Sequence, residues 1–504
     1  MTPEKEPALA VPKVPTGIPG LDDLAQGGLT KGRSTLVSGT AGCGKSIFAA
    51  MFLAGGVRAG EAGVYVTFEE SPADIRANLR GLGLDIAAWE KQRLWVFVDA
   101  SVGRGEATVV GRYDLGALLA RVEHAVSTVG ARRVAMDSLG AILTQFNDPA
   151  AVRSAIMRCS TTLDGLGVTS VFTAERDDDY GPVSRFGVEE FVADNIVVLR
   201  NVLFDEKRRR TLEVLKLRGA PHHRGEFPFS IQPGRGIVVV PVAAFAMKQR
   251  PTTARVTFGN PDLDAMLGGG LYQDHVVLLS GPTGTGKSML AAAFVAGGAA
   301  AGERALLFAF EEGRQQVLRN AVGPGKQLRQ LEKKGRVRIQ SAFPEAMSLE
   351  DRLLYMLREL EEFQPTRIAV DSLSALQRVA TEKPFREFVL GLNAYVKQHG
   401  ICTLYTSATV GTFSSQTPSD YSMWTLLDVI VTLRHVELLG RMRRGIAVLK
   451  MRGSKHDSRI REFTIGSQGL RIGEPFAAAT GILRGHPQPL EEAVIESLRQ
   501  RPHD

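Results

Sequence analysis

The sequence predicts an α/β protein of two tandem domains, each a doubly wound, mainly parallel sheet with helices on both faces. Three observations lead to this prediction. Short motifs occur twice along the 504 residues, and within each copy nearly continuous apolar runs alternate with helical stretches. One apolar run in each copy leads through a Gly-rich turn into an Ala-rich helical run. Continuous apolar runs are typical of parallel strands that are covered on both faces.

Four short blocks establish the repeat, because they occur twice in the same order. The first two recur 242 residues later, Gly39–Ser46 as Gly281–Ser288 and Phe68–Glu70 as Phe310–Glu312. The last two recur 234 residues later, Met136–Leu139 as Val370–Leu373 and Leu215–Gly219 as Leu449–Gly453. The difference of eight residues between the offsets is a loop-sized deletion in the second copy.

The length of the chain also favours two domains, since single hydrophobic cores stop growing near about 250 to 300 residues. Pro and Gly between Pro233 and Pro251 mark the junction. We therefore expect a flexible N-terminus over 1–14, a first domain over 15–243, a linker over 244–254, a second domain over 255–485 and a tail over 486–504.

Composition excludes several classes of protein. With 44% hydrophobic and 23% charged residues the chain is typical of globular proteins. It has no run of about 20 apolar residues, so we expect no membrane span and a soluble, cytoplasmic protein. Three widely spaced cysteines favour reduced thiols over disulfides or zinc ligands. The net charge of +7 is scattered, so we do not expect a nucleic-acid partner, and Lys207–Arg210 is interpreted as a solvated hairpin end.

The strands of the first copy can be placed directly. Apolar runs predict parallel strands at Thr35–Ser38, Val64–Phe68, Arg133–Met136 and Ser170–Thr173. Two later runs, Asn195–Arg200 and Arg210–Leu217, are separated by a basic turn. They predict an antiparallel hairpin that completes the sheet.

Each copy contains a G-x-x-x-x-G-K-S phosphate loop between a strand and a helix, which predicts ATP and Mg²⁺ as cofactors. Backbone N–H groups and the helix N-terminus attract phosphate oxygens. We predict Lys45 and Lys287 as phosphate ligands and Ser46 and Ser288 as metal ligands. The ATP-binding loops comprise Gly39, Thr40, Ala41, Gly42, Cys43, Gly44, Lys45 and Ser46, and Gly281, Pro282, Thr283, Gly284, Thr285, Gly286, Lys287 and Ser288. A chance Gly-rich turn is the alternative, and two matches in register argue against it.

Acidic residues follow two strands of each copy. Asp137 and Asp371 end apolar runs, where a carboxylate can hold Mg²⁺ through water, although such a residue can also cap a turn. One glutamate of each pair, Glu69 and Glu70 or Glu311 and Glu312, is predicted as the general base of phosphoryl transfer. The alternative is that these acids only favour the N-terminus of the next helix.

Cations recur along the last predicted hairpin. Arg210 precedes Lys216 by six residues, as Arg444 precedes Lys450, so on a regular strand each pair projects from one face. His222 and His456 follow six residues after each lysine. We predict that these cations, including Arg210 and Arg444 as catalytic arginine fingers, serve the ATP of a neighbouring subunit. An ordinary exposed hairpin is the alternative.

With these motifs the chain resembles the KaiC-like family of circadian-clock ATPases and autokinases within the RecA superfamily of P-loop NTPases. The resemblance extends from about Pro15 to Leu490. It is carried by Phe68–Pro72, Tyr180–Pro182, Gly187–Phe191, Leu215–Gly219, Phe310–Glu312, Lys450–Ser454 and His456–Asp457.

The resemblance implies a double-ring homohexamer of RecA-like domains with ATP between subunits. It implies a slow ATPase in the first domain and a serine/threonine autokinase and autophosphatase in the second, with Glu311 as base and metal ligand beside Glu312. It also implies contacts to the neighbour's ATP from Lys216, Leu217, Arg218 and His222, and from Arg444, Lys450, Met451, Arg452, Ser454 and His456. A KaiB-like protein would bind the region Ala174–Asn195, and a signalling kinase is a further partner to consider.

One departure from the family pattern concerns phosphorylation. The adjacent Ser-Thr acceptors of the family fall on Trp424 and Thr425, which leaves Thr425 as the predicted phosphoacceptor. Two other readings stay open: a RecA- or DnaB-like motor that binds DNA in a central channel, and a signalling scaffold that ATP assembles without kinase activity.

Overall fold

The computed structural model describes residues 11–100, 115–143, 149–187, 189–204, 207–240, 252–321, 323–408, 426–438, 440–467, 469–476, 479–480 and 488–489. Two compact units divide the chain, Met1–Ala244 and Phe245–Asp504. Each unit is described by itself below.

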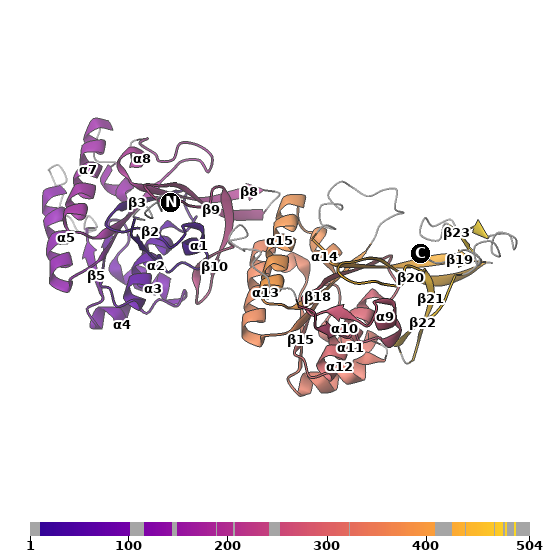
Figure 1. The fold of residues 1–504 in the computed structure, drawn as a ribbon. Helices are drawn as coiled ribbons and strands as arrows, with labels where there is room; N and C mark the ends of the chain where they lie inside the picture. The colour runs from indigo at the N-terminus through magenta and orange to yellow at the C-terminus, as the bar shows by residue number, and fades with distance from the viewer. Residues whose placement is uncertain are drawn as a thin grey trace, which may run out of the picture. The chain divides into compact units, whose positions relative to one another are not determined.

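A nine-stranded sheet forms the centre of the first domain (Figure 1). Five of its strands and β8 are parallel, and β8 to β11 pair antiparallel. This confirms the four predicted parallel strands and the predicted hairpin. The order is β11 (Gly236–Val239), β10 (Glu226–Gln232), β9 (Lys207–Leu217), β8 (Asn195–Phe204), β3 (Ser34–Gly39), β7 (Thr169–Glu175), β6 (Arg133–Asp137), β4 (Gly63–Thr67) and β5 (Trp95–Asp99).

Helices cover both faces of this sheet. Leu36 and Val37 are neighbours on β3, so their side chains point to opposite faces of the sheet. Val37 packs in a core with residues of α1 (Leu21–Leu24), α2 (Lys45–Arg58), α3 (Pro72–Arg80) and α4 (Ile86–Lys91). Leu36 packs in a second core with residues of α5 (Leu115–Val129), α6 (Leu139–Leu143) and α7 (Pro149–Gly165). A short helix α8 (Glu189–Val192) precedes β8, and β1 (Lys13–Val14) pairs with β2 (Leu29–Thr30).

The second domain repeats this topology strand for strand, which confirms the predicted tandem α/β fold. Helices α9 to α12 supply one core of the sheet, while Asn393 of α15 accepts a hydrogen bond from Tyr405 on the opposite side. The strand order is β16 (Val337–Ser341), β15 (Ala305–Ala309), β17 (Arg367–Asp371), β18 (Cys402–Ala408), β14 (Val276–Gly281), β19 (Val429–Leu438), β20 (Arg441–Met451), β21 (Arg461–Gly466) and β22 (Gly469–Pro475). The helices are α9 (Pro261–Met266), α10 (Lys287–Ala300), α11 (Arg314–Asn320), α12 (Pro324–Lys333), α13 (Leu349–Phe363), α14 (Leu373–Gln377) and α15 (Glu382–Gln398).

Two short pairs complete the described strands of this domain. They are β12 (Arg255–Val256) with β13 (Leu271–Tyr272), and β23 (Ala479–Thr480) with β24 (Gln488–Pro489).

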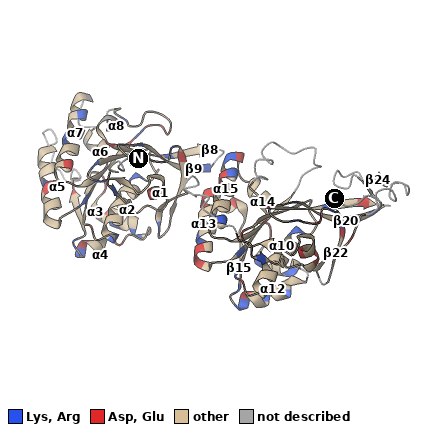
Figure 2. Cartoon of the chain, in the orientation of Figure 1, with Lys and Arg blue, Asp and Glu red and all other residues tan. Residues whose placement is uncertain are grey.

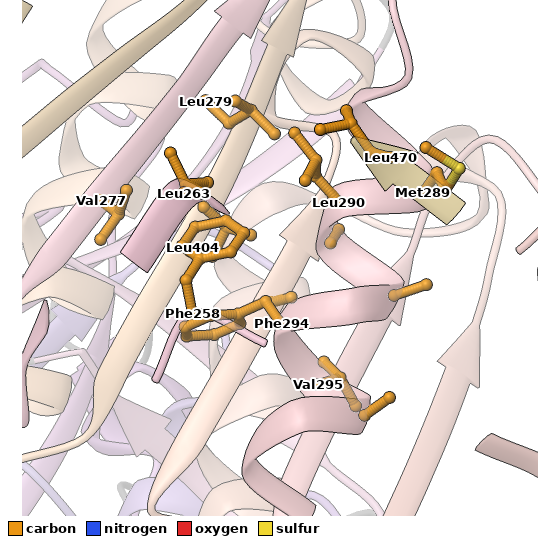
Figure 3. Packing of buried hydrophobic residues seen from close by; sticks show 14 of the residues in the cluster. Phe258, Leu263, Val277, Leu279, Met289, Leu290, Phe294, Val295, Leu404 and Leu470 are labelled. Carbon is orange, nitrogen blue, oxygen red and sulfur yellow. The ribbon is translucent and has the colours of Figure 1, made fainter. Parts of the chain in front are cut away.

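In each domain a buried arginine, Arg133 or Arg367, begins the strand that ends at the predicted metal-binding aspartate. Arg367 donates to Glu303 at 2.7 Å and 3.0 Å, and to the backbone oxygens of Thr257 and Phe294 at 2.8 Å each. Phe294 also packs against Phe258, with the two rings tilted by 53°, in the core seen in Figure 3. Arg133 makes the matching bonds in the first domain. These arginines fix the helix after each phosphate loop against the strand of the aspartate.

The two cores differ at a position in the helix that follows each phosphate loop. Met51 of α2 fills the space under β11, where its sulfur accepts a hydrogen bond from Ile237 N at 3.0 Å. The equivalent residue of α10, 242 positions later, is Ala293. Ala293 lines a cavity of about 530 Å³ together with Gly469 and Leu470. The matching position of the second domain thus carries a shorter side chain beside a cavity.

Charged side chains of both signs are interspersed over the helices, as on α12, α13 and α15 (Figure 2). Among the residues that the structure describes, no helix is long and apolar enough to cross a membrane.

Candidate functional site

The two phosphate loops lie between a central strand and the helix that follows it, β3 and α2 or β14 and α10. Each loop needs glycine where the backbone turns left-handed. The φ angles are 73° at Gly42 and 107° at Gly44, and 82° at Gly284 and 98° at Gly286. Side chains rarely adopt this conformation, so the glycines let the loop wrap around the free N–H groups of the helix N-terminus. The arrangement creates an anion site in each domain.

Both loop lysines reach across their own loop. Lys45 Nζ donates to the Gly39 and Thr40 carbonyl oxygens at 2.9 Å and 3.0 Å. Lys287 Nζ makes the same bonds, to Gly281 and Pro282 at 2.7 Å and 2.9 Å. Burial lowers the pKa of Lys287, although the nearby acids Asp371 and Glu311 oppose that effect. The ammonium groups are thus held at the loop opening, where the prediction places the outer phosphates.

The aspartates lie at the carboxyl ends of β6 and β17, beside the loops. Asp371 accepts hydrogen bonds from Thr406 and from Ser288, the predicted metal ligand. Burial raises the pKa of Asp371, and those two hydroxyls oppose the shift. In the first domain Thr173 Oγ1 donates to Asp137 Oδ1, and Tyr65 donates to Asp137 Oδ2 at 2.7 Å. In both domains the peptide bond that follows the aspartate is cis.

The threonines were not among the predicted site residues. Thr173 and Thr406 occupy matching positions in β7 and β18, and a threonine retained at the same place in both copies was the signal that could have identified them. Tyr65 has no equivalent hydroxyl, since residue 307 is leucine.

The oxygen donors suit a hard cation such as Mg²⁺, which takes one or two carboxylates, water and substrate phosphates. Ser288 and Asp371 already meet through a hydrogen bond. Within the described ranges no group of three His, Cys, Asp or Glu residues could hold a metal by itself.

Each glutamate pair follows the end of the strand next to one edge of the sheet, β4 or β15, and the two members of a pair have different contacts. Asn78 Nδ2 donates to Glu70 Oε2 at 3.1 Å, and Asn320 Nδ2 donates to Glu312 Oε1 at 3.1 Å. The second glutamate of each pair is thus anchored to the following helix in both domains. The first member of each pair, Glu69 or Glu311, lies within electrostatic reach of the loop lysine.

The pKa of Glu69 is raised, first by partial desolvation and then by the surrounding carboxylates of Glu175, Asp137 and Glu70. Lys45 acts in the opposite direction. A raised pKa makes a carboxylate a better proton acceptor as long as it stays ionised. Glu311 differs, because its Oε1 lies 3.0 Å from Arg378 Nη2.

The cationic strands require one correction. We expected Arg210 and Lys216 to project from one face, but β9 carries an extra residue, Leu215, between Val214 and Lys216. Arg210 pairs with Asn201 and Lys216 with Ile196, and these partners lie five residues apart on β8. Because alternate residues share a face, the two cations lie on opposite faces.

The same register shift occurs in the second domain, where Arg444 pairs with His435 and Lys450 with Ile430. The ammonium group of each lysine donates a hydrogen bond to a backbone carbonyl oxygen. Lys216 Nζ donates to Ala193 O at 2.8 Å, and Lys450 Nζ donates to Leu427 O at 2.7 Å.

The residues after the lysines have mixed roles. The side chains of Leu217 and Met451 pack in the hydrophobic cores. Only the backbone atoms of these two residues could therefore contact a ligand. Arg218 lies 3.2 Å from Asp194, and Arg452 lies 3.4 Å from Asp428.

The remaining predicted residues of this region also have defined places. Ser454 accepts a hydrogen bond from Arg255 and His456 is half-buried. Among the buried described atoms without a hydrogen-bond partner are Nε of Arg210, Nε of Arg444 and Nδ1 of His222.

The loop residues Thr40 and Cys43 have structural contacts as well. Thr40 Oγ1 donates to Asp179 Oδ1 at 2.8 Å, which ties the first phosphate loop to the segment after β7. Burial raises the pKa of the Cys43 thiol. All three cysteines are buried and free. Thr425 and Trp424 lie outside the described residues.

Comparison with known proteins agrees with this geometry. The family described as "ATPase: KaiC" matches residues 14–244 and 256–476. The chain is 51% identical over 489 residues to the circadian clock protein KaiC3 of Synechocystis sp., with 97% of each chain covered. It is 44% identical over 487 residues to the circadian clock oscillator protein KaiC of Thermostichus vulcanus, covering 96% of this chain and 94% of that one. It is likewise 44% identical over 479 residues to KaiC of Synechococcus elongatus, with 95% and 92% covered.

Proposed function

Because the chain belongs to the KaiC family of ATPases, we propose that it is an ATP-dependent switch with different chemistry in its two domains. The first domain hydrolyses ATP, and the second transfers the γ-phosphoryl group to a hydroxyl of the chain itself and later removes it. The observation that carries this proposal is the duplicated site, in which a phosphate loop, a lysine and a strand-end aspartate meet in each copy.

Binding of ATP follows from the loops. The N–H groups at the start of α2 and α10 would hold phosphate oxygens. The ammonium groups of Lys45 and Lys287 would give up their hydrogen bonds to the loop carbonyl oxygens and bind the outer phosphates instead. Ser46 with Asp137, and Ser288 with Asp371, would hold Mg²⁺. When bound, Mg²⁺ neutralises charge that develops on the phosphates.

Glu69 and Glu311 are proposed as the bases. Each would accept a proton from the attacking group, a water in the first domain and a hydroxyl in the second. Glu70 and Glu312 are proposed as positioning residues, because Asn78 and Asn320 hold their carboxylates. Glu311 is also proposed as a second metal ligand of its domain.

A homohexamer is proposed, with each nucleotide between two subunits. Support comes from Arg210 and Arg444, whose Nε atoms occupy matching buried positions without a partner in the described part of the chain. These arginines would supply positive charge to the neighbour's ATP, which is typical of arginine fingers. The register shift assigns Lys216 and Lys450 to the other face, so their contact to nucleotide would be separate from that of the arginines.

Thr425 is proposed as the phosphoacceptor, and a KaiB-like protein as a partner for Ala174–Asn195. Within this segment Tyr180 is exposed, its ring lies 5.3 Å from the Arg200 guanidinium, and Asp177 and Asp178 are exposed beside it. A timing or signalling output is proposed by analogy with the named clock relatives.

Two measurements test the proposal. Light scattering should show a hexamer that forms with Mg-ATP, and a persistent monomer would contradict the shared sites. Mass spectrometry after incubation with Mg-ATP should find one phosphopeptide, lost in both Thr425→Ala and Lys287→Ala. An unmodified wild type would exclude the autokinase.

The alternatives are separated by two controls. Salt-sensitive retention of DNA on filters would favour the motor. ATP turnover that is negligible in the wild type, and equal to that of Glu69→Gln, would favour the scaffold.

A further inference from the structure

Glu175 lies at the carboxyl end of β7, next to the first phosphate loop. In the parallel register of β3 and β7 it stands opposite Gly39, the first residue of the loop. Its own carbonyl accepts a hydrogen bond from Arg185 N at 3.1 Å, and its side chain is half-buried. The residue is therefore placed at the edge of the sheet where the lysine and the aspartate meet.

The face on which the Glu175 side chain lies follows from Thr173. The Thr173 hydroxyl bonds the Asp137 carboxylate, so it points to the nucleotide side of the strand end. Side chains two residues apart on a strand share a face. Glu175 therefore extends the same row, one position closer to the phosphate loop.

Charge connects Glu175 to the proposed base. The titratable groups that act on Glu69 are the acids Glu175, Asp137 and Glu70 and the base Lys45. Glu175 is the strongest of the three acids in raising the pKa of Glu69, after desolvation. Neither Asp137 nor Glu70 distinguishes the two domains, because both have counterparts in Asp371 and Glu312.

The matching position of β18 in the second domain carries no carboxylate. Its strand β18 keeps the threonine, since Thr406 bonds Asp371, but two residues later it has Ala408. Ala408 stands opposite Gly281 in the register of β14 and β18, as Glu175 stands opposite Gly39. The neighbouring groups there are neutral hydroxyls, because Ser374 lies 3.0 Å from Ser407 and accepts a hydrogen bond from Ala408 N.

We propose that Glu175 is a positioning residue for hydrolysis in the first domain, which acts through Glu69, and that Ala408 withholds this effect from the second domain. The negative charge of Glu175 favours proton transfer from the attacking water to Glu69. Removing it leaves Glu69 in place as a weaker base. This inference rests on the proposed ATPase activity of the first domain.

The first test measures ATP turnover against pH in full-length protein carrying Lys287→Ala, so that only the first site turns over. Glu175→Gln should lower kcat about three- to ten-fold near neutral pH and move the acidic limb of the rate profile to lower pH. KM for ATP should not rise, because a negative charge has left the phosphate site. Glu175→Asp should restore most of the rate. An unchanged kcat and limb in Glu175→Gln would overturn the inference, whereas a wild type without turnover would contradict the proposed function.

A second measurement does not depend on turnover. Carbodiimide reacts with protonated carboxyl groups, and peptide mass spectrometry locates the modified residue. The pH midpoint of Glu69 labelling should be lower in Glu175→Gln than in the wild type. Equal midpoints in wild type and Glu175→Gln would overturn the inference even if the protein hydrolysed no ATP.

Discussion

Arg378 and Glu311 form an ion pair in the second domain, with 3.0 Å between Nη2 and Oε1. Arg378 follows α14, and its guanidinium is largely exposed, with 63% of the side chain accessible. The pair occupies one carboxylate oxygen of the proposed base. An exposed ion pair contributes about 0 to 1 kcal/mol, so it can restrain the base without blocking it.

We predict that Arg378→Ala increases ATP turnover by the second domain up to about five-fold, the factor that corresponds to about 1 kcal/mol. The rate would be measured with Lys45→Ala as background, so that the first site is silent. Arg358→Ala is the matched control, because Arg358 pairs with Glu362 on the same domain at 3.7 Å. A slower Arg378→Ala enzyme would mean that Arg378 helps the reaction instead.

Glu69 gives a prediction with a defined pH dependence. A base must be deprotonated, so activity is lost as pH falls through its pKa. Because the pKa of Glu69 is raised above the usual value of 4.5 for a glutamate, the acidic limb of first-domain turnover should lie above that pH. Glu69→Gln should reduce turnover about 10²- to 10⁴-fold and remove the limb.

The control is Glu70→Gln, which keeps Glu69 and changes the carboxylate that Asn78 holds. Glu70→Gln should reduce ATP turnover less than Glu69→Gln does, and it should leave the acidic limb of the rate profile in place. If Glu70→Gln is the more damaging of the two, the roles within the pair are reversed.

The sequence predicted the parts of the site that local patterns encode. Gly-rich loops before helices, acids at strand ends and a hairpin after the last parallel strand all depend on residues close in sequence. Because these motifs occur in both copies, each prediction had two supporting observations. Loop and aspartate could be expected to meet because the carboxyl ends of parallel strands lie at one edge of the sheet.

Other parts depended on register and could not be read from the sequence. The extra residue at Leu215 reverses the face of Lys216, and nothing in the composition of that strand marks a bulge. The partners of Glu70 and Glu311 lie 8 and 67 residues away along the chain. Such pairs become visible only when helices are docked on the sheet.

The buried arginines make a prediction on stability. Arg367 is inaccessible to solvent, and its replacement by methionine would leave the backbone oxygens of Thr257 and Phe294 without this donor. We expect a loss of at least about 3 kcal/mol in the second domain. Calorimetry should show that domain's unfolding transition at lower temperature.

Arg336→Met is the control, since Arg336 bonds Gly302 O at an exposed site. Gly298→Ala offers an independent check, because a Cβ there would lie 2.3 Å from Arg367 Nε. A second-domain transition that stays unchanged in Arg367→Met would contradict the anchoring role.

Met51 of the first domain and Ala293 of the second occupy matching positions. Replacing each by the residue type of the other domain is therefore a reciprocal test. Ala293 lines the cavity of about 530 Å³ beneath β22, so Ala293→Met should fill part of it and stabilise the second domain by about 0.5 to 2 kcal/mol. Met51→Ala should destabilise the first domain by about 2 to 5 kcal/mol, because it removes buried atoms that the surrounding core cannot replace. Calorimetry of both variants should move the two transitions in opposite directions. If Ala293→Met destabilises the second domain, the space is too narrow for the longer side chain and overpacking outweighs the gain.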